Sequence, residues 1–162
     1  MESSSSNWFL SFAYGEDYET ALPTKYLNLA ESDRPDKARI NKWRLTAIGM
    51  LLINVALIAH FSGWYFIIWL TDWGAVLTLL CLILTQSASK DPRISSKTGK
   101  LAWIHILTEI CLFTNLVITL VYWTVLHFLF IEYLEGLTEF HMYAVHSFPF
   151  IATLMNLHVT DI

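Results

Sequence analysis

Apolar residues gather in four long stretches that are separated by shorter polar segments. The stretches cover about residues 45–60, 64–85, 101–130 and 140–159. Roughly 20 mostly apolar residues in a helix are enough to cross the hydrocarbon of a bilayer, and backbone groups inside lipid are satisfied only within helices or closed barrels. The pattern therefore predicts an all-α membrane protein, a bundle of about four transmembrane helices over residues 44–162.

The first stretch is shorter and the third is longer than a helix that just crosses the hydrocarbon. The first is short, and we expect Arg44 and His60 at its two ends to extend their polar tips to water. The third would be about 45 Å long as a helix, more than one span needs. Its outer end is expected to tilt or to project from the membrane.

Residues 1–43 form a polar leader that begins with a serine run and contains several acidic and aromatic side chains. The leader lacks the early basic region of a signal peptide and the acid-poor composition of a transit peptide. Its composition fits a disordered tail, and its aromatic side chains fit a segment held by a partner subunit. We favour the contact with a partner.

The ten lysine and arginine residues predict the topology, because they lie in only two regions. One region approaches the first stretch (Lys25, Arg34, Lys37, Arg39, Lys42, Arg44) and the other joins the second and third stretches (Lys90, Arg93, Lys97, Lys100). By the positive-inside rule both regions lie on the inner side, so the spans alternate in direction and the N- and C-termini share that side. The acidic loop 131–139 then falls outside. The membrane could be an endomembrane or the mitochondrial inner membrane.

Composition excludes several classes of function. The chain is 55% hydrophobic and 15% charged with a net charge of −4, so its surface is expected to contact membrane lipids, and no basic patch predicts nucleic-acid binding. Cys81 and Cys111 lie inside predicted spans, where a thiol usually packs as a small side chain. The sequence contains no nucleotide-binding loop, metal-spaced cysteine cluster or serine elbow, and we expect no cofactor or metal.

Polar side chains inside the predicted spans are the candidates for function, because an ionisable group in lipid is costly unless it faces protein or water. They are Thr71 and Asp72 in the second span, His105 and Glu109 in the third, and His141 and His146 in the fourth. Thr71 lies about seven residues from the outer start of its span, roughly 10 Å deep, and the fourth-span histidines bracket a similar depth. A hydroxyl beside an imidazole is the minimum nucleophile and base for acyl transfer. The alternative is that Thr71 bonds its own backbone or a neighbouring helix.

The other polar residues favour structural roles. His105 and Glu109 are four apart and share a helix face; we favour an interhelical hydrogen-bonding pair over a proton path or metal ligands. His141 and His146 are about 140° apart around a helix, so they are not expected to chelate a metal together. One asparagine in each of three spans (Asn54, Asn115, Asn156) predicts bonds between helices. Pro149 should kink the fourth span and shape a cavity beside the histidines.

Two motifs carry a resemblance to a known family. Trp69-Leu70-Thr71-Asp72-Trp73-Gly74 resembles the aromatic-Leu-Thr-Asn/Gln-Trp-Gly signature of rolling-stone-like membrane proteins, relatives of the androgen-induced family. Val121-Tyr122-Trp123, followed by His141 and Ser147-Phe148-Pro149-Phe150, is similar to the later spans of that family. The resemblance covers about residues 60–155.

The resemblance implies a polytopic threonine hydrolase that cleaves fatty acid esters of hydroxy fatty acids with one threonine and one histidine inside the membrane. Thr71 matches the family threonine. An ungapped match at Pro149-Phe150 places Ala144 in the column of the catalytic histidine and His141 in that of another family histidine, while His146 fits only if the register shifts by two. Family members usually carry further spans, so the fold is expected to be shortened.

Two functions follow from these observations. In the first, the chain is a non-catalytic accessory or structural subunit of a larger membrane complex, built on a hydrolase-like helical fold, with the leader as a contact. In the second, it is an intramembrane threonine hydrolase of fatty acyl esters, in which Thr71 is the nucleophile, His141 or His146 the base, and Asp72 an orienting group. We favour the first.

Overall fold

The structure is a computed structural model that describes residues 37–62, 69–91 and 98–160. Its elements are α4 (Lys37–Ser62), α5 (Leu70–Ser89), α6 (Thr98–Val121), the π-helical turn η3 (Tyr122–Leu126), α7 (His127–Phe130), the 3-10 turn η4 (Ile131–Tyr133) and α8 (Leu137–Thr160). No strand occurs within these ranges, and the prediction of an all-α bundle is confirmed. Most of the predicted leader, residues 1–36, lies outside the described residues, and 37–43 already belong to α4.

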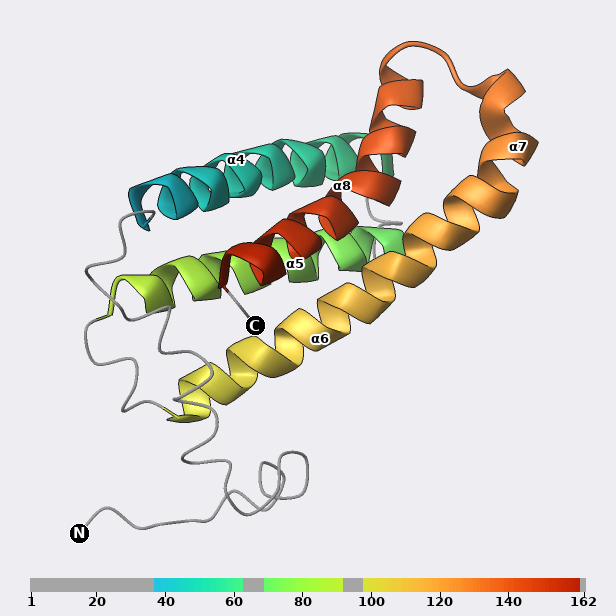
Figure 1. The fold of residues 1–162 in the computed structure, drawn as a ribbon. Helices are drawn as coiled ribbons and strands as arrows, with labels where there is room; N and C mark the ends of the chain where they lie inside the picture. The colour runs from blue at the N-terminus through green and yellow to red at the C-terminus, as the bar shows by residue number, and fades with distance from the viewer. Residues whose placement is uncertain (1–36, 63–68, 92–97, 161–162) are drawn as a thin grey trace, which may run out of the picture.

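The four long helices alternate in direction (Figure 1). One end of the bundle holds the starts of α4 and α6 and the ends of α5 and α8. α5 and α8 each contact the other three long helices. α6 continues through η3 and α7 as one long rod, from whose far end the chain turns back into α8. The alternation agrees with the order of directions predicted from the placement of basic residues.

Within the described residues, three helical segments are long and apolar enough to cross a membrane. They are Lys37–Phe61, Leu70–Ser89 and Gly99–Phe130. The fourth predicted span falls in α8, which has 24 residues and is therefore about 36 Å long, but carries more polar side chains. By length and composition the chain is thus an all-α membrane protein with three candidate spanning helices, against which α8 packs.

The start of α5 differs from the predicted second span. Trp69 has an extended backbone (φ −93°, ψ 119°) and is the N-cap, so the helix begins at Leu70. Thr71 therefore lies in the first turn of α5, and its expected depth, seven residues from the outer start of the span, stays a prediction. The segment 63–68, part of the predicted span, lies outside the described residues.

The apolar core is small and is shared by α4, α5 and α8. One cluster joins Leu51, Leu82 and Ala152, and a second joins Ile58, Ala75 and Val145. Large apolar side chains such as Phe113 and Phe128 are 66% and 71% exposed. An outward apolar surface of this kind is expected of helices that face lipid.

α8 bends near its middle (Figure 1). Pro149 lies inside this helix, and a proline both removes one backbone hydrogen bond and crowds the preceding turn. The Thr153 hydroxyl donates to the Pro149 carbonyl at 2.8 Å, within the turn that follows. The kink expected from the sequence is present.

Candidate functional site

A buried asparagine joins three helices at the centre of the bundle. Asn115 of α6 is 2% exposed, and its Nδ2 donates to the Thr78 hydroxyl of α5 at 2.7 Å and to the Thr153 hydroxyl of α8 at 3.3 Å. Each threonine in turn donates to a carbonyl of its own helix. The amide is therefore shared between two hydroxyls that are already oriented by their own backbones, and this arrangement holds α5, α6 and α8 in register.

Gly74 lets α5 and α6 approach each other at this junction. A Cβ atom at Gly74 would lie 2.6 Å from Asn115 Oδ1 and 2.8 Å from Ile118 Cδ1, both far closer than a van der Waals contact. The Asn115 side chain cannot withdraw without losing its bonds to the two threonines. The glycine of the Trp69–Gly74 motif therefore has a packing role in this structure.

The other asparagines also join helices. Asn156 Oδ1 accepts from Arg44 Nε at 3.0 Å, and Asn54 Nδ2 donates to the Ala144 carbonyl at 3.4 Å. The prediction that these residues bond between helices is confirmed. Arg44 is only 4% exposed, so the expectation that it extends to water was wrong, because α8 supplies a partner inside the bundle.

The predicted nucleophile and bases are not joined by a hydrogen bond. In the described part of the chain the Thr71 hydroxyl, half-buried at the start of α5, bonds neither histidine. The Ala75 and Val145 side chains, each one turn further along, pack in one cluster. Thr71 and His141 therefore lie at the same end of the bundle, but the contact needed for proton transfer, about 2.6–3.2 Å, is not made.

The two histidines of α8 face different neighbours, as their spacing predicts. His141 is 5% exposed and stacks on Phe61 of α4, with ring centroids 4.9 Å apart. His146 is 7% exposed and stacks on Tyr122, with centroids 3.9 Å apart and planes at 15°. Its Nδ1 donates to the Met142 carbonyl at 2.6 Å.

Asp72 is buried near the N-terminus of α5, where it is the third helical residue after the N-cap. A carboxylate in the first turn is stabilised by the unpaired backbone N–H groups and by the helix dipole. Stabilisation of the helix N-terminus is therefore enough to explain an acidic residue at this position, and Asp72 need not orient a catalytic histidine.

An aromatic cluster forms around Tyr122 at the π-helical turn. Tyr122 is fully buried and contacts the rings of Trp123, His127 and Tyr143 as well as His146. Trp123 donates from Nε1 to the Ser147 hydroxyl of α8 at 2.9 Å. Val121-Tyr122-Trp123 was noted in the sequence only as part of the family resemblance, and His127 was not predicted. The available signal was an aromatic pair followed by a histidine. Such π-helical turns are frequent at functional sites.

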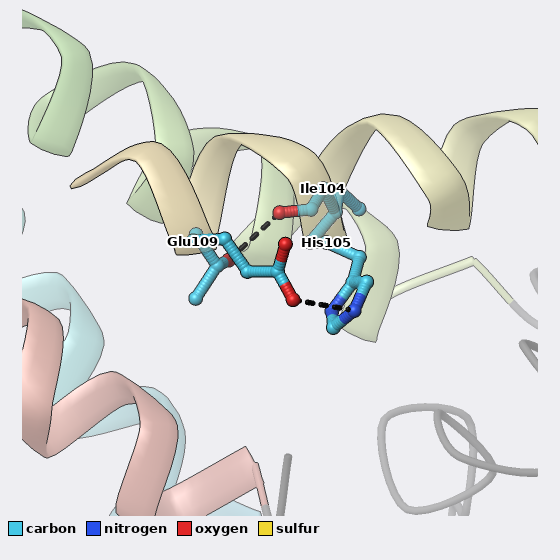
Figure 2. Close-up of polar contacts among 4 residues, drawn as sticks. Ile104, His105 and Glu109 are labelled. Carbon is cyan, nitrogen blue, oxygen red and sulfur yellow. Dashed lines mark hydrogen bonds and ion pairs between the residues drawn. The ribbon is translucent and has the colours of Figure 1, made fainter. Parts of the chain in front are cut away.

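His105 and Glu109 contact each other within α6 (Figure 2). His105 Nε2 lies 3.1 Å from Glu109 Oε1, and the two side chains are 7% and 55% exposed. The shared helix face is confirmed. This contact joins two residues of one helix, and the hydrogen bonding between helices that the sequence predicted stays a prediction. The pair extends from the packed side of α6 to its outer surface.

Two cavities lie between α4 and α8. The larger has a volume of about 370 Å³ and the smaller about 60 Å³. The larger is lined by Met50, Ile53, Asn54, Leu57, Phe140, Tyr143, Ala144, Ser147, Phe148 and Ile151. Neither cavity is lined by Pro149, His141, His146 or Thr71, so the expectation that Pro149 shapes a cavity beside the histidines was wrong for these two cavities.

Residues 37–62, 69–91 and 98–160 contain no cluster of metal-binding side chains. No group of three or more histidine, cysteine, aspartate or glutamate side chains there could hold a metal ion. Cys81 and Cys111 are free and buried, and the Cys81 thiol lies 3.3 Å from the Thr108 hydroxyl of α6. Both cysteines therefore pack at the α5–α6 contact.

Compared with known proteins, the chain matches no protein-family model, no curated protein and no solved structure. The class that the fold defines is an all-α membrane protein with several candidate spanning helices. The resemblance to rolling-stone-like proteins stays a hypothesis that is based on the two motifs.

Proposed function

We propose that the chain is a non-catalytic accessory or structural subunit of a larger membrane complex, built on a helical fold similar to that of the rolling-stone-like hydrolases. The observation that carries this proposal is the separation of the groups that acyl transfer would need. Thr71 bonds neither histidine in the described residues, and His141 and His146 stack on side chains of two different helices. Neither cavity between α4 and α8 opens on these groups.

The polar side chains of the bundle support this interpretation, because they hold helices together. Asn115, Asn156 and Asn54 each bond a neighbouring helix, and Thr119 donates to the His146 carbonyl at 2.7 Å. Such bonds are what polar residues inside membrane bundles commonly provide. A framework of this kind presents helix surfaces to other subunits and needs no reacting group.

We propose further that the helix ends rich in lysine and arginine lie on the inner side of the membrane, with both termini there. The aromatic leader then contacts another subunit on that side. The membrane is an endomembrane or the mitochondrial inner membrane.

A specific observation favours a second candidate, an intramembrane threonine hydrolase of fatty acyl esters. The His146 Nδ1–H bond to Met142 leaves Nε2 as the unprotonated nitrogen, which is the form that a general base requires. In this alternative Thr71 is the nucleophile, His141 or His146 the base and Asp72 an orienting group, and the helices close around the substrate before reaction.

Turnover of a fluorogenic long-chain acyl ester separates the two functions. The wild-type protein, Thr71→Ala and the control Thr124→Ala would be assayed in mild detergent; Thr124 is exposed and bonds only its own helix. The accessory function predicts equal background turnover by all three. Turnover that is lost in Thr71→Ala and kept in Thr124→Ala would establish the hydrolase and overturn the proposal.

A further inference from the structure

Glu109 is an ionisable side chain within the long apolar segment Gly99–Phe130. It lies nine residues beyond Lys100, the last lysine or arginine of the printed sequence, which corresponds to about 14 Å along the helix axis. The hydrocarbon is about 30 Å thick, and the apolar segment Gly99–Phe130 continues far beyond Glu109. If Lys100 marks the inner boundary, Glu109 lies close to the middle of the bilayer.

The surface around Glu109 is apolar and faces away from the bundle. The Glu109 side chain is 55% exposed, and Phe113, Val117 and Leu120, which follow it on the same side of α6, are 66%, 51% and 53% exposed. We call these four residues the α6 outer face. The buried His105 contacts one carboxylate oxygen of Glu109 (Figure 2).

Lipid chains offer no hydrogen-bond donor or counter-ion, so a carboxylate at this depth requires a protein partner or water. We propose that the α6 outer face docks a transmembrane helix of another subunit that carries a lysine or arginine at the depth of Glu109. The apolar residues supply the packing surface, and the Glu109 carboxylate accepts from the partner's cation. This inference rests on the proposed function and names the surface and the chemistry of the partner.

A second copy of this chain does not supply that cation. All ten lysine and arginine residues lie at or before Lys100, so two copies facing each other through this surface would bring two carboxylates together. Pairing with Lys25 or Arg34 of the same chain would carry the backbone of the leader into hydrocarbon, where its polar groups have no partners. The charge complement therefore comes from a different protein.

The first test identifies what lies on the α6 outer face. A photo-cross-linking amino acid would replace Phe113 in the full chain, in its own membrane and with Glu109 unchanged. We expect a cross-link to a membrane-spanning peptide of another protein that contains lysine or arginine. A cross-link to a second copy, to the leader of the same chain, to lipid alone, or to a spanning peptide without a basic residue would overturn the proposal.

The second test measures the contribution of the charge. Glu109→Gln keeps the shape of the side chain, and Glu135→Gln is the control because Glu135 is exposed in the turn before α8. We expect Glu109→Gln to reduce the co-purified partner about tenfold or more, Glu135→Gln to leave it unchanged, and Glu109→Lys with an acidic residue at the partner's basic position to restore it.

An intact assembly in Glu109→Gln would overturn the docking surface while the accessory function stands. A chain that purifies without partners and shows Thr71-dependent ester turnover would instead overturn the accessory function itself.

Discussion

The two faces of α6 differ in how they satisfy polar side chains. On the inner face Asn115 finds two threonine hydroxyls on two other helices, and Thr108 bonds its own helix and contacts Cys81. On the outer face the polar contact of Glu109 within the described residues is with His105 of the same helix, and its side chain is more than half exposed. Asn115 and Thr108 on the inner face bond within this chain, whereas the outer face, in our proposal, binds another subunit.

The largest effect is expected at the aromatic end of the inner face. Tyr122→Ala removes a fully buried ring that stacks on His146 and should lower the free energy of unfolding by about 3 kcal/mol. Tyr122→Phe should cost almost nothing, because the Tyr122 hydroxyl is buried without a hydrogen-bond partner in the described residues. Denaturant unfolding in detergent measures both variants, and an equal loss in the two would show that the hydroxyl, and not the ring, stabilises the fold.

The next largest effect is expected at the close approach of α5 and α6. Gly74→Ala should destabilise the bundle by about 2 kcal/mol, because the added methyl group overlaps Asn115 and Ile118. Gly49→Ala is the matched control: a Cβ there meets nothing within 4 Å, and alanine favours a helix over glycine. Thermal unfolding compares the stabilities of the two variants. If Gly74→Ala were as stable as Gly49→Ala, the close approach of α5 and α6 would not limit the side chain at residue 74.

A smaller effect is expected from the polar junction itself. Asn115→Leu and Thr78→Val, measured singly and together, form a double-mutant cycle whose coupling energy should be about 0.6–1.7 kcal/mol, the range found for hydrogen bonds between membrane helices. Additive effects would mean that the 2.7 Å bond between these side chains does not stabilise the bundle.

The smallest effect on the fold is expected on the outer face. Glu109→Gln in the protein purified without partners should change the free energy of unfolding by less than about 0.5 kcal/mol, because the side chain is more than half exposed and its polar contact within the described residues is with His105 of the same helix. A loss comparable with that of Tyr122→Ala would place Glu109 among the residues that hold the fold, and the contrast between the two faces would disappear.

Hydrophobic pattern and charge predicted the bundle well, because both act over whole segments of the chain. The four helices, their alternation and the asparagine bonds between them all follow from apolar length, basic residues and polar groups that lipid cannot satisfy. The position of Leu70 as the first residue of α5 could not be found in this way, because the residues on both sides of it are equally apolar and a backbone angle at Trp69 sets the boundary.

Side-chain partners were predicted less well, because they depend on residues far apart in the chain. Arg44 was expected in water, yet it bonds Asn156, which is 112 residues away. The π-helical turn at Tyr122–Leu126 leaves no mark in the hydrophobic pattern, and His127 was therefore overlooked. The sequence could not predict whether the Thr71 hydroxyl meets a histidine, because it does not show which way each histidine of α8 faces.

We propose that this chain works as part of an assembly and not as an enzyme on its own. Native mass spectrometry of the protein, extracted from its own membrane in mild detergent, measures this. We expect a stoichiometric complex with at least one other membrane subunit. A single, stable copy of the chain that hydrolyses an acyl ester, and loses this activity in Thr71→Ala, would contradict it.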